Sequence, residues 1–515
     1  MSAEMPATSL LDHVTNISDF IWGGTWYGEQ VYLPFGVPLL PMTFMLLGVG
    51  LYLMIGLRGY PILKLGSAFM GLFSSRKGKG EGEISPFAAL STALSGQVGT
   101  GNLAGVATAI ALGGPGAVFW MWITALIGMA LGFAEGALAI RYREKTVEGH
   151  WRGGPMSYIM QGLGPKWTWL AIIFCIGTLF SGLVTGNSIQ SNEVASGLQE
   201  LFGIERWLGG LIVAIAVFVV IIGGIKSIGS IAEKVVPFMA AAYITMALIA
   251  IFINIADIPE TFSRIFAGAF NMQSASGGFA GAAIIMAIRA GVARGLFSNE
   301  SGQGSTPIAH AVAQTDDPQL QGRMAMMGTF IDTIVICTMT ALVILTVEGP
   351  FSFEGEAVKH VWQSDLGTTA QSGFVTTSAA FAAAFPFLIG NVPLGTLVAS
   401  VALMLFVFTT LLTWSYYGER AITFIYDRFP GSTPGGEKIL HIIWRVLWCV
   451  AIWFSATQPS QLVWRLGDIS NATMALPNLI ALAALSGVVF KLAKGHKDAG
   501  NDHVDNASSS ETRAD

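Results

Sequence analysis

Three glycines and several polar residues interrupt an apolar segment of this chain between Ser95 and Asn102, where the sequence reads SGQVGTGN. Each glycine costs about 1 kcal/mol relative to alanine in a helix interior, so the pattern predicts a broken helix. Freed carbonyls of the first half can coordinate a cation, and freed N–H groups of the second half can hold a carboxylate. The alternative is a glycine-rich helix that packs closely on its neighbours. We interpret the stretch as a site for a zwitterion beside a monovalent cation.

A second interruption is predicted from 294 to 305, where the sequence reads RGLFSNESGQGS. Its glycines and polar side chains do not suit one regular helix facing lipid. Pro307 fits the first turn of a new half-helix, where a missing N–H costs nothing. Two glycine-interrupted hydrophobic segments in corresponding halves of a chain are typical of the binding site of a secondary transporter.

Composition places these segments in a membrane. The 515 residues are 53% hydrophobic and 11% charged, whereas soluble domains carry roughly 25% charged residues. Cys175, Cys337 and Cys449 lie in apolar runs without CxxC spacing, so neither a disulfide framework nor a metal site is expected. The histidines form no metal-binding motif, no nucleotide-binding GxxxxGK[ST] stretch occurs, and no cleaved signal peptide is expected. We predict an all-α polytopic membrane protein.

Hydropathy predicts about eleven transmembrane helices. They cover roughly residues 38–57, 86–112, 117–140, 167–185, 208–225, 236–255, 278–313, 324–347, 394–417, 439–455 and 473–490. Three weaker segments are read as a short cytoplasmic helix at 157–162, a cap on the outer face at 187–202 and an extracellular hairpin at 373–385.

Basic residues set the orientation. With the N-terminus outside, most of the 27 Lys and Arg are cytoplasmic, and those predicted outside are Arg206, Arg264, Lys359 and Arg465. The expected organisation is an outer segment (1–37), a first peripheral span with a cytoplasmic loop (38–84), two inverted repeats of five spans (85–257 and 258–494) and a disordered cytoplasmic tail (495–515).

The region from Ser85 to Glu135 and the block GLFSNESGQGSTPIAHA resemble the two characteristic motifs of the alanine or glycine:cation symporter family, also called sodium:alanine symporters. The likeness extends from the first span to the eleventh. It implies the leucine-transporter fold, with a 5+5 inverted repeat and two broken helices. It also implies sodium-coupled uptake of alanine or glycine, possible acceptance of D-amino acids, no organic cofactor and no nucleic-acid partner. We expect a functional monomer in the lipid of a bacterial inner membrane.

The resemblance also implies substrate-binding residues. The N–H groups of Thr100, Gly101 and Asn102 match the unwound piece that holds the substrate carboxylate. Phe297 is expected to keep the pocket small, and Trp414 either closes it or simply packs. The complete predicted set is Gln97, Thr100, Gly101, Asn102, Gly295, Phe297, Ser298, Asn299 and Trp414.

Sodium is expected between the first and eighth core helices of that fold. The hydroxyls of Thr409 and Thr410 would join the carbonyls of Ser95, Val98 and Phe406, because a hard cation prefers oxygen ligands. The alternative is that the two threonines only bond back to their own helix.

Charged residues inside spans are functional candidates by default: Glu135, Arg289, Arg294, Glu300 and Asp332. We predict that Arg294 and Glu300 form a structural pair or a cytoplasmic gate. If Asp332 or Glu300 titrates, protons could replace sodium. An ion channel and an intramembrane enzyme are the remaining alternatives, and the enzyme is disfavoured because no GxSxG elbow occurs.

Overall fold

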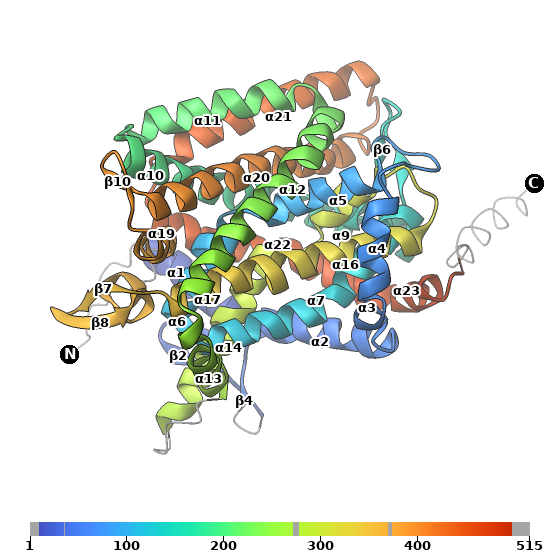
Figure 1. The fold of residues 1–515 in the computed structure, drawn as a ribbon. Coiled ribbons are helices and arrows are strands. Elements are labelled where there is room, and N and C mark those ends of the chain that lie inside the picture. The colour runs from blue at the N-terminus through green and yellow to red at the C-terminus, as the bar shows by residue number, and fades with distance from the viewer. Residues whose placement is uncertain (1–9, 35–36, 271–277, 369–372, 497–515) are drawn as a thin grey trace, which may run out of the picture.

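The helices of the computed structural model run mainly along one common direction and form one bundle (Figure 1). The structure describes residues 10–34, 37–270, 278–368 and 373–496. Within these ranges, six helices are long and apolar enough to cross a membrane, or seven if one bent pair counts as a single span. The chain is therefore a polytopic helical membrane protein, as composition predicts.

The first half of the chain supplies the following helices: α1 (Leu10–Gly23), α2 (Pro41–Gly56), α3 (Tyr60–Leu63), α4 (Leu65–Ser74), α5 (Pro86–Gln97), η2 (Gly101–Gly105), α6 (Val106–Gly113), α7 (Gly116–Arg141), α8 (Pro155–Leu163), η3 (Pro165–Trp167), α9 (Thr168–Ser181), η4 (Gly182–Ile189), α10 (Gln190–Phe202), α11 (Arg206–Ile221) and α12 (Gly224–Ile253). The segments η2 and η4 are π-helical.

The second half supplies these helices: η5 (Ile255–Asp257), α13 (Ile258–Phe270), α14 (Gly278–Asn299), α15 (Thr306–His310), α16 (Pro318–Thr329), the π-helical η6 (Phe330–Cys337), α17 (Thr338–Thr346), η7 (Val361–Gln363), α18 (Asp365–Thr368), α19 (Gly373–Ala384), α20 (Leu394–Tyr426), α21 (Pro434–Ser455), α22 (Ser460–Ala484) and α23 (Ser486–Ala493).

Short antiparallel hairpins connect some of these helices. Their strands are β1 (Thr25–Trp26), β2 (Glu29–Gln30), β3 (Tyr32–Leu33), β4 (Val37–Pro38), β5 (Glu144–Lys145), β6 (Trp151–Arg152), β7 (Glu348–Phe353), β8 (Glu356–His360), β9 (Leu388–Ile389) and β10 (Val392–Pro393).

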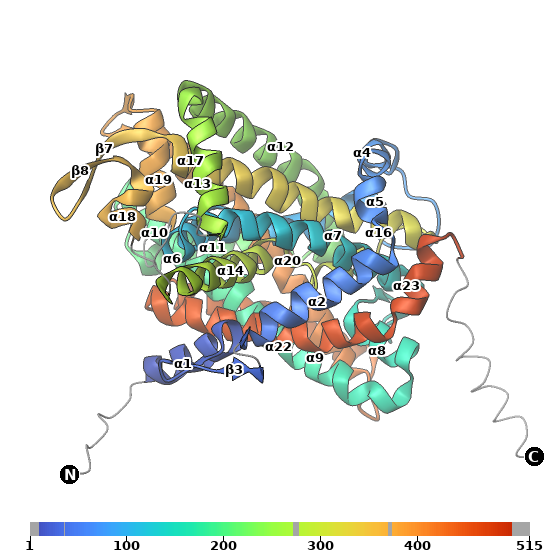
Figure 2. The ribbon, with the colours of Figure 1, turned by 90° about the horizontal axis from the view of Figure 1, so that it is seen from below.

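The two ends of the described chain lie at opposite ends of the bundle. The N-terminal α1 shares one end with the β7–β8 hairpin, and the C-terminal α23 shares the other with α4 and α8 (Figures 1 and 2). Below, these are called the α1 end and the α23 end.

At the α23 end, the β5–β6 hairpin is bonded to the segments that flank both predicted interruptions. The N–H of Trp151 donates to the carboxylate of Glu83, just before α5, at 2.8 Å. The guanidinium of Arg143 donates to the carbonyl of Ala313, just beyond α15, at 2.8 Å.

Three predicted segments differ from the structure. Residues 187–202 do not form a separate cap, because one continuous helical stretch of 38 residues runs from Pro165 to Phe202. Residues 373–385 are not a hairpin: α19 is a helix that buries Phe374 and Phe381. The last predicted span is bent by 65° between α22 and α23. The short helix at 157–162 is confirmed as α8, and the predicted disordered tail lies, from residue 497 on, outside the described residues.

Candidate functional site

The first interruption lies between α5 and α6. Helix α5 ends at Gln97, and Val98 takes up an extended conformation with φ −77° and ψ 93°. The chain then resumes as η2 and continues as α6. Carbonyls at such an end have no partner within the helix and can bind elsewhere.

The hydroxyl of Thr410, on α20, lies among three main-chain carbonyl oxygens. Its Oγ1 is 3.0 Å from the oxygen of Ser95, 3.2 Å from that of Val98 and 2.9 Å from that of Phe406. One hydroxyl has one proton, so it cannot fully satisfy three acceptors. Four oxygen atoms with surplus lone pairs therefore converge at a buried point between α5 and α20. A hard monovalent cation suits such a set of ligands.

Thr409 points elsewhere. Its hydroxyl lies 3.0 Å from the carbonyl oxygen of Phe406, on its own helix, and 3.7 Å from the sulfur of Met239, on α12. The predicted back-bonding alternative therefore describes Thr409 in this conformation, while both hydroxyls share the carbonyl of Phe406.

Thr413 also joins α20 to α5, and the sequence reasoning missed it. Its Oγ1 lies 2.5 Å from the hydroxyl of Ser95 and donates to the carbonyl of Thr92 at 3.1 Å. Thr413 follows Thr410 by three residues, which places both on one face of a helix. That spacing was the signal in the sequence.

The second interruption lies between α14 and α15. Helix α14 ends at Asn299, and the following Glu300 has a φ of 54°. Gly302 and Gly304 have φ values of 86° and 88°, which glycine adopts without steric cost. Pro307 lies in the first turn of α15, as predicted.

The two interruptions contact each other. The side-chain amide of Gln97 donates to the carbonyl of Asn299 at 2.5 Å. A Cβ on Gly101 would lie 2.9 Å from a ring carbon of Phe297 and 3.0 Å from the Cα of Ser298. Only glycine permits this approach, so the two breaks lie in direct contact at Gly101, Phe297 and Ser298.

Asp332, on η6, holds both interruptions from one side. Its carboxylate accepts hydrogen bonds from Asn102 Nδ2 at 2.6 Å, from the hydroxyl of Ser298 at 2.8 Å and from that of Thr333 at 2.8 Å. All of these side chains are fully buried. The bonds of Asp332 to the two breaks were not predicted from the sequence.

Two buried polar atoms at the first break have no hydrogen-bond partner within the described residues: the hydroxyl oxygen of Thr100 and Oε1 of Gln97. The N–H of Thr100 donates to Oε1 of Gln190, on α10, at 3.1 Å. The N–H of Asn102 donates to the carbonyl of Gly99 at 3.3 Å. Two of the three N–H groups predicted for a carboxylate thus have protein partners in this conformation, and the contact of Gln190 with the first break was not indicated by the sequence.

The aromatic residues of the site lie on either side of the second break. The ring of Phe297 packs on Trp464, with centroids 4.9 Å apart. The indole N–H of Trp414 donates to Glu300 at 2.9 Å. Gly295 is turned away from the first break, since a Cβ there would lie 3.2 Å from Thr124 on α7.

The predicted pair of Arg294 with Glu300 is wrong. Arg294 bonds Asp468, on α22, at 3.0 Å and lies over the ring of Trp464 at 4.9 Å. Glu300 instead accepts from the hydroxyl of Ser305 at 2.5 Å. A helical turn and a half separates Arg294 from Glu300, and the end of α14 directs the two side chains to different neighbours.

Comparison with known proteins identifies the family of the chain. A sequence model of the sodium:alanine symporter family matches residues 36–509. The chain belongs to this family. It is accordingly an amino-acid symporter and a multi-pass membrane protein, not an enzyme.

Several relatives of this symporter resemble it over nearly their whole length. It is 39% identical to the sodium/alanine symporter AgcS of Methanococcus maripaludis, over 96% of this chain and 99% of the relative. It is 38% identical to the putative sodium/proton-dependent alanine carrier protein YrbD of Bacillus subtilis, over 87% of each chain. It is 35% identical to the probable sodium/glutamine symporter GlnT of Bacillus subtilis, over 96% of this chain and 93% of the relative.

Proposed function

We propose that this protein couples inward sodium movement to uptake of a small neutral amino acid, alanine or glycine, by alternating access. The observation that carries the proposal is the cluster of oxygen atoms around Thr410. It lies directly against the first interruption, so an ion bound there would stabilise the unwound backbone that receives the substrate.

The proposed sodium ligands are the carbonyls of Ser95, Val98 and Phe406 together with the hydroxyl of Thr410. Thr409 stays a proposed fifth ligand, because its hydroxyl already contacts the same Phe406 carbonyl at 3.0 Å. A rotation of that side chain would bring it to the ion. Sodium is the coupling ion in this proposal, and no organic cofactor is needed.

The proposed substrate site lies where the two breaks meet. The carboxylate binds the N–H groups of Thr100, Gly101 and Asn102, which requires the amide oxygen of Gln190 to leave the N–H of Thr100. The hydroxyl of Thr100 gives a further donor, since it has no other partner within the described residues. All of these groups are hydrogen-bond donors, and the substrate carboxylate supplies the acceptor oxygens.

We propose that the residues facing these N–H groups bind the ammonium group and the side chain of the substrate. Gln97, Ser298 and Asn299 supply polar groups near the ammonium. Phe297, backed by Trp464, limits the side chain to a small one, because overlap with a packed ring costs more than a missing contact. Trp414 holds Glu300 beside the site, and Gly295 lets α14 approach α7.

We also propose the topology predicted from hydropathy and charge. Eleven spans form a peripheral helix followed by two inverted repeats of five, at 85–257 and 258–494, each with one broken helix. The positions of α1 and α23 at opposite ends of the bundle support an odd number of spans (Figure 1). With basic residues facing the cytoplasm, the α1 end is outside and the α23 end inside. The protein acts as a monomer in a bacterial inner membrane.

Reconstitution tests the function. Purified protein in liposomes should take up labelled alanine only when sodium is higher outside, and collapse of the sodium gradient should abolish uptake. The rate should saturate with alanine concentration. Uptake that is independent of sodium, or conductance without saturation, would contradict the proposal. Unlabelled glycine, serine, glutamine and D-alanine as competitors rank the substrates.

Proton coupling is the second candidate, and Asp332 favours it. A fully buried carboxylate bonded to both breaks is placed to take up a proton when the site changes shape. The name of one relative, a putative sodium/proton-dependent alanine carrier, is consistent with either ion. Uptake driven by a pH gradient in sodium-free buffer would favour the proton.

A further inference from the structure

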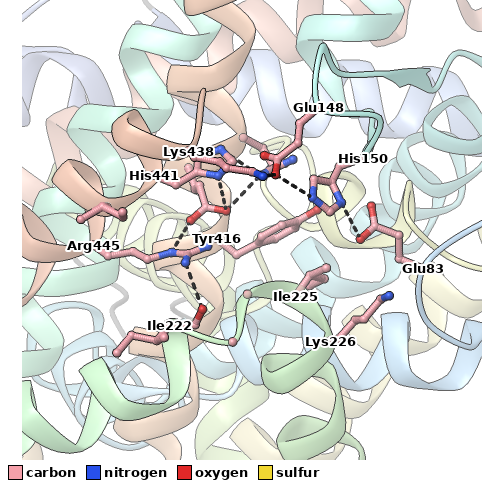
Figure 3. A pocket seen from close by; sticks show the side chains of 15 residues that line it. Glu83, Glu148, His150, Ile222, Ile225, Lys226, Tyr416, Lys438, His441 and Arg445 are labelled. Carbon is pink, nitrogen blue, oxygen red and sulfur yellow. Dashed lines mark hydrogen bonds and ion pairs between the residues drawn. The ribbon is translucent and has the colours of Figure 1, made fainter. Parts of the chain in front are cut away.

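A cavity of about 380 Å³ lies beside the β5–β6 hairpin (Figure 3). It lies between the β5–β6 hairpin, the start of α12, the end of α20 and the start of α21. Charged side chains dominate its walls, among them Glu148, Arg420 and Lys438. The transport site described above uses none of them.

Three potential metal ligands meet beside this cavity. Glu148, Glu437 and His441 each offer one ligand atom, and these atoms lie within 4.8 Å of one another. Glu437 and His441 are one turn apart on α21, with Oε1 of the acid 3.7 Å from Nε2 of the imidazole. The N–H of Glu148 donates to Oε2 of Glu437 at 2.9 Å, which fixes the hairpin loop against α21.

An unsatisfied oxygen lies at the centre of this group. Glu437 is fully buried, and its Oε1 has no hydrogen-bond partner within the described residues. A buried carboxylate oxygen without a proton or cation is costly.

The facing nitrogen, Nε2 of His441, is an acceptor rather than a donor. Nε2 of His441 lies 3.2 Å from Nη2 of Arg420, and arginine can only donate. The hydroxyl of Thr423, 3.0 Å from the same nitrogen, already donates to the carbonyl of Glu419 at 2.7 Å. Two acceptor atoms, Oε1 of Glu437 and Nε2 of His441, thus lie 3.7 Å apart, and a metal ion between them would take the place of the Arg420 donor.

The charged groups around Glu148, Glu437 and His441 do not fully neutralise the two carboxylates, so a bound cation would be stabilised there. Glu419 accepts from Arg420 at 2.9 Å and from Arg445 at 2.7 Å, so both guanidinium groups are already paired. The cationic groups nearest Glu148 belong to exposed side chains: the ammonium of Lys438, 66% exposed, is 3.5 Å away, and the ring of His150, 45% exposed, is 3.9 Å away. That lysine can move into solvent.

We propose that Glu148, Glu437 and His441 bind a divalent transition-metal ion, with Zn²⁺ the best match. Two carboxylates and one imidazole are a ligand set that Zn²⁺ accepts, and water from the cavity supplies the fourth position. Glu148 and His441 line the cavity, which gives the ion an entry path (Figure 3). The bound ion would fasten the β5–β6 loop to α21. This inference is independent of which ion and amino acid the protein transports.

Direct binding tests the proposal without any transport assay. The full-length protein in detergent is stripped with a chelator and titrated with Zn²⁺ by calorimetry. We expect one saturable site per chain that Mg²⁺ and Ca²⁺ do not fill. Glu437→Gln and His441→Gln should each weaken Zn²⁺ binding by roughly tenfold or more. Glu356→Gln, an exposed acid on β8 at the α1 end, is the control and should bind as the wild type does.

A second variant covers the case in which these buried substitutions impair folding. Lys438→Gln removes the exposed ammonium that competes for Glu148, so Zn²⁺ should bind more tightly than in the wild type. Absence of saturable Zn²⁺ binding in the wild type would overturn the proposal. Unchanged affinity in folded Glu437→Gln, or unchanged or weaker affinity in Lys438→Gln, would overturn it as well.

Discussion

The side-chain amide of Gln97 donates to the main-chain carbonyl of Asn299 across 2.5 Å, and this bond joins the end of α5 to the end of α14. A side chain from one interrupted helix thus satisfies backbone exposed by the other. The two breaks form one structural unit, so a substitution in either break should alter the structure of both.

Thr410 is expected to be the most sensitive residue of the proposed sodium site. Thr410→Ala removes the hydroxyl at the centre of three carbonyls. The half-saturating sodium concentration for alanine uptake should rise roughly tenfold, equivalent to about 1.4 kcal/mol. Thr410→Ser should restore most of the affinity. Thr409→Ala should raise the half-saturating sodium concentration by less than Thr410→Ala does. A larger increase in Thr409→Ala would mean that Thr409 is the more important sodium ligand.

Gly101 should tolerate no side chain. In Gly101→Ala the new Cβ would lie 3.0 Å from the Cα of Ser298, a backbone atom that cannot turn aside. Overpacking of this kind costs about 1–3 kcal/mol, and we expect alanine uptake to fall at least roughly tenfold. Gly105→Ala is the matched control on the same π-helical segment, because its Cβ would have no neighbour closer than 3.9 Å. Equal uptake by the two variants would show that the contact does not matter.

Asp332→Asn keeps the shape of the side chain but replaces one acceptor oxygen with an N–H donor. Asn102, Ser298 and Thr333 all donate to this carboxylate, so at least one bond must be lost. A buried group left unsatisfied costs about 1–3 kcal/mol. We expect a lower melting temperature and loss of alanine uptake, whichever ion is coupled. Normal uptake by this variant would exclude Asp332 from the site.

His150 and Glu83 should make the hairpin at the α23 end sensitive to pH. The hydrogen bond to Glu83 raises the pKa of His150 above its usual 6.5. Burial raises the pKa of Glu83, but the hydrogen bonds from His150 and from the Trp151 N–H outweigh burial. The resulting pKa of Glu83 is below its usual 4.5.

The direction in which stability changes with pH follows from how folding shifts the pKa of each group. His150 contributes its stabilisation fully below pH 6.5 and loses it as pH rises through the raised pKa. Glu83 contributes above pH 4.5 and loses its part as pH falls through the lowered pKa. The melting-temperature difference between the wild type and His150→Gln should therefore be largest between about pH 5 and 6.5 and shrink as the pH rises through the raised pKa of His150. A difference that grows with pH would contradict the pairing.

The sequence was most informative where the signal is local. Glycine clusters and Pro307 act on the backbone of their own segment, so both interruptions could be predicted with nearly correct bounds. The pairing of Thr410 with α5 followed from the family resemblance rather than from local pattern.

Partners distant in the chain could not be predicted. Asp468 lies 174 positions after Arg294, and no periodicity links the two. Gln190 reaches Thr100 only because the fourth span continues through η4 to Phe202, and hydropathy gives no sign of that continuation once polar residues begin. Choice among such partners depends on how the helices pack.

The β5–β6 hairpin has a consequence for the order of events in transport. Through Trp151 and Arg143 it is bonded at once to the chain entering α5 and to the chain leaving α15. If the protein works by alternating access, as proposed, opening of the site at this end requires both bonds to break. The β5–β6 hairpin would then control opening at this end, although it lies outside the proposed substrate site.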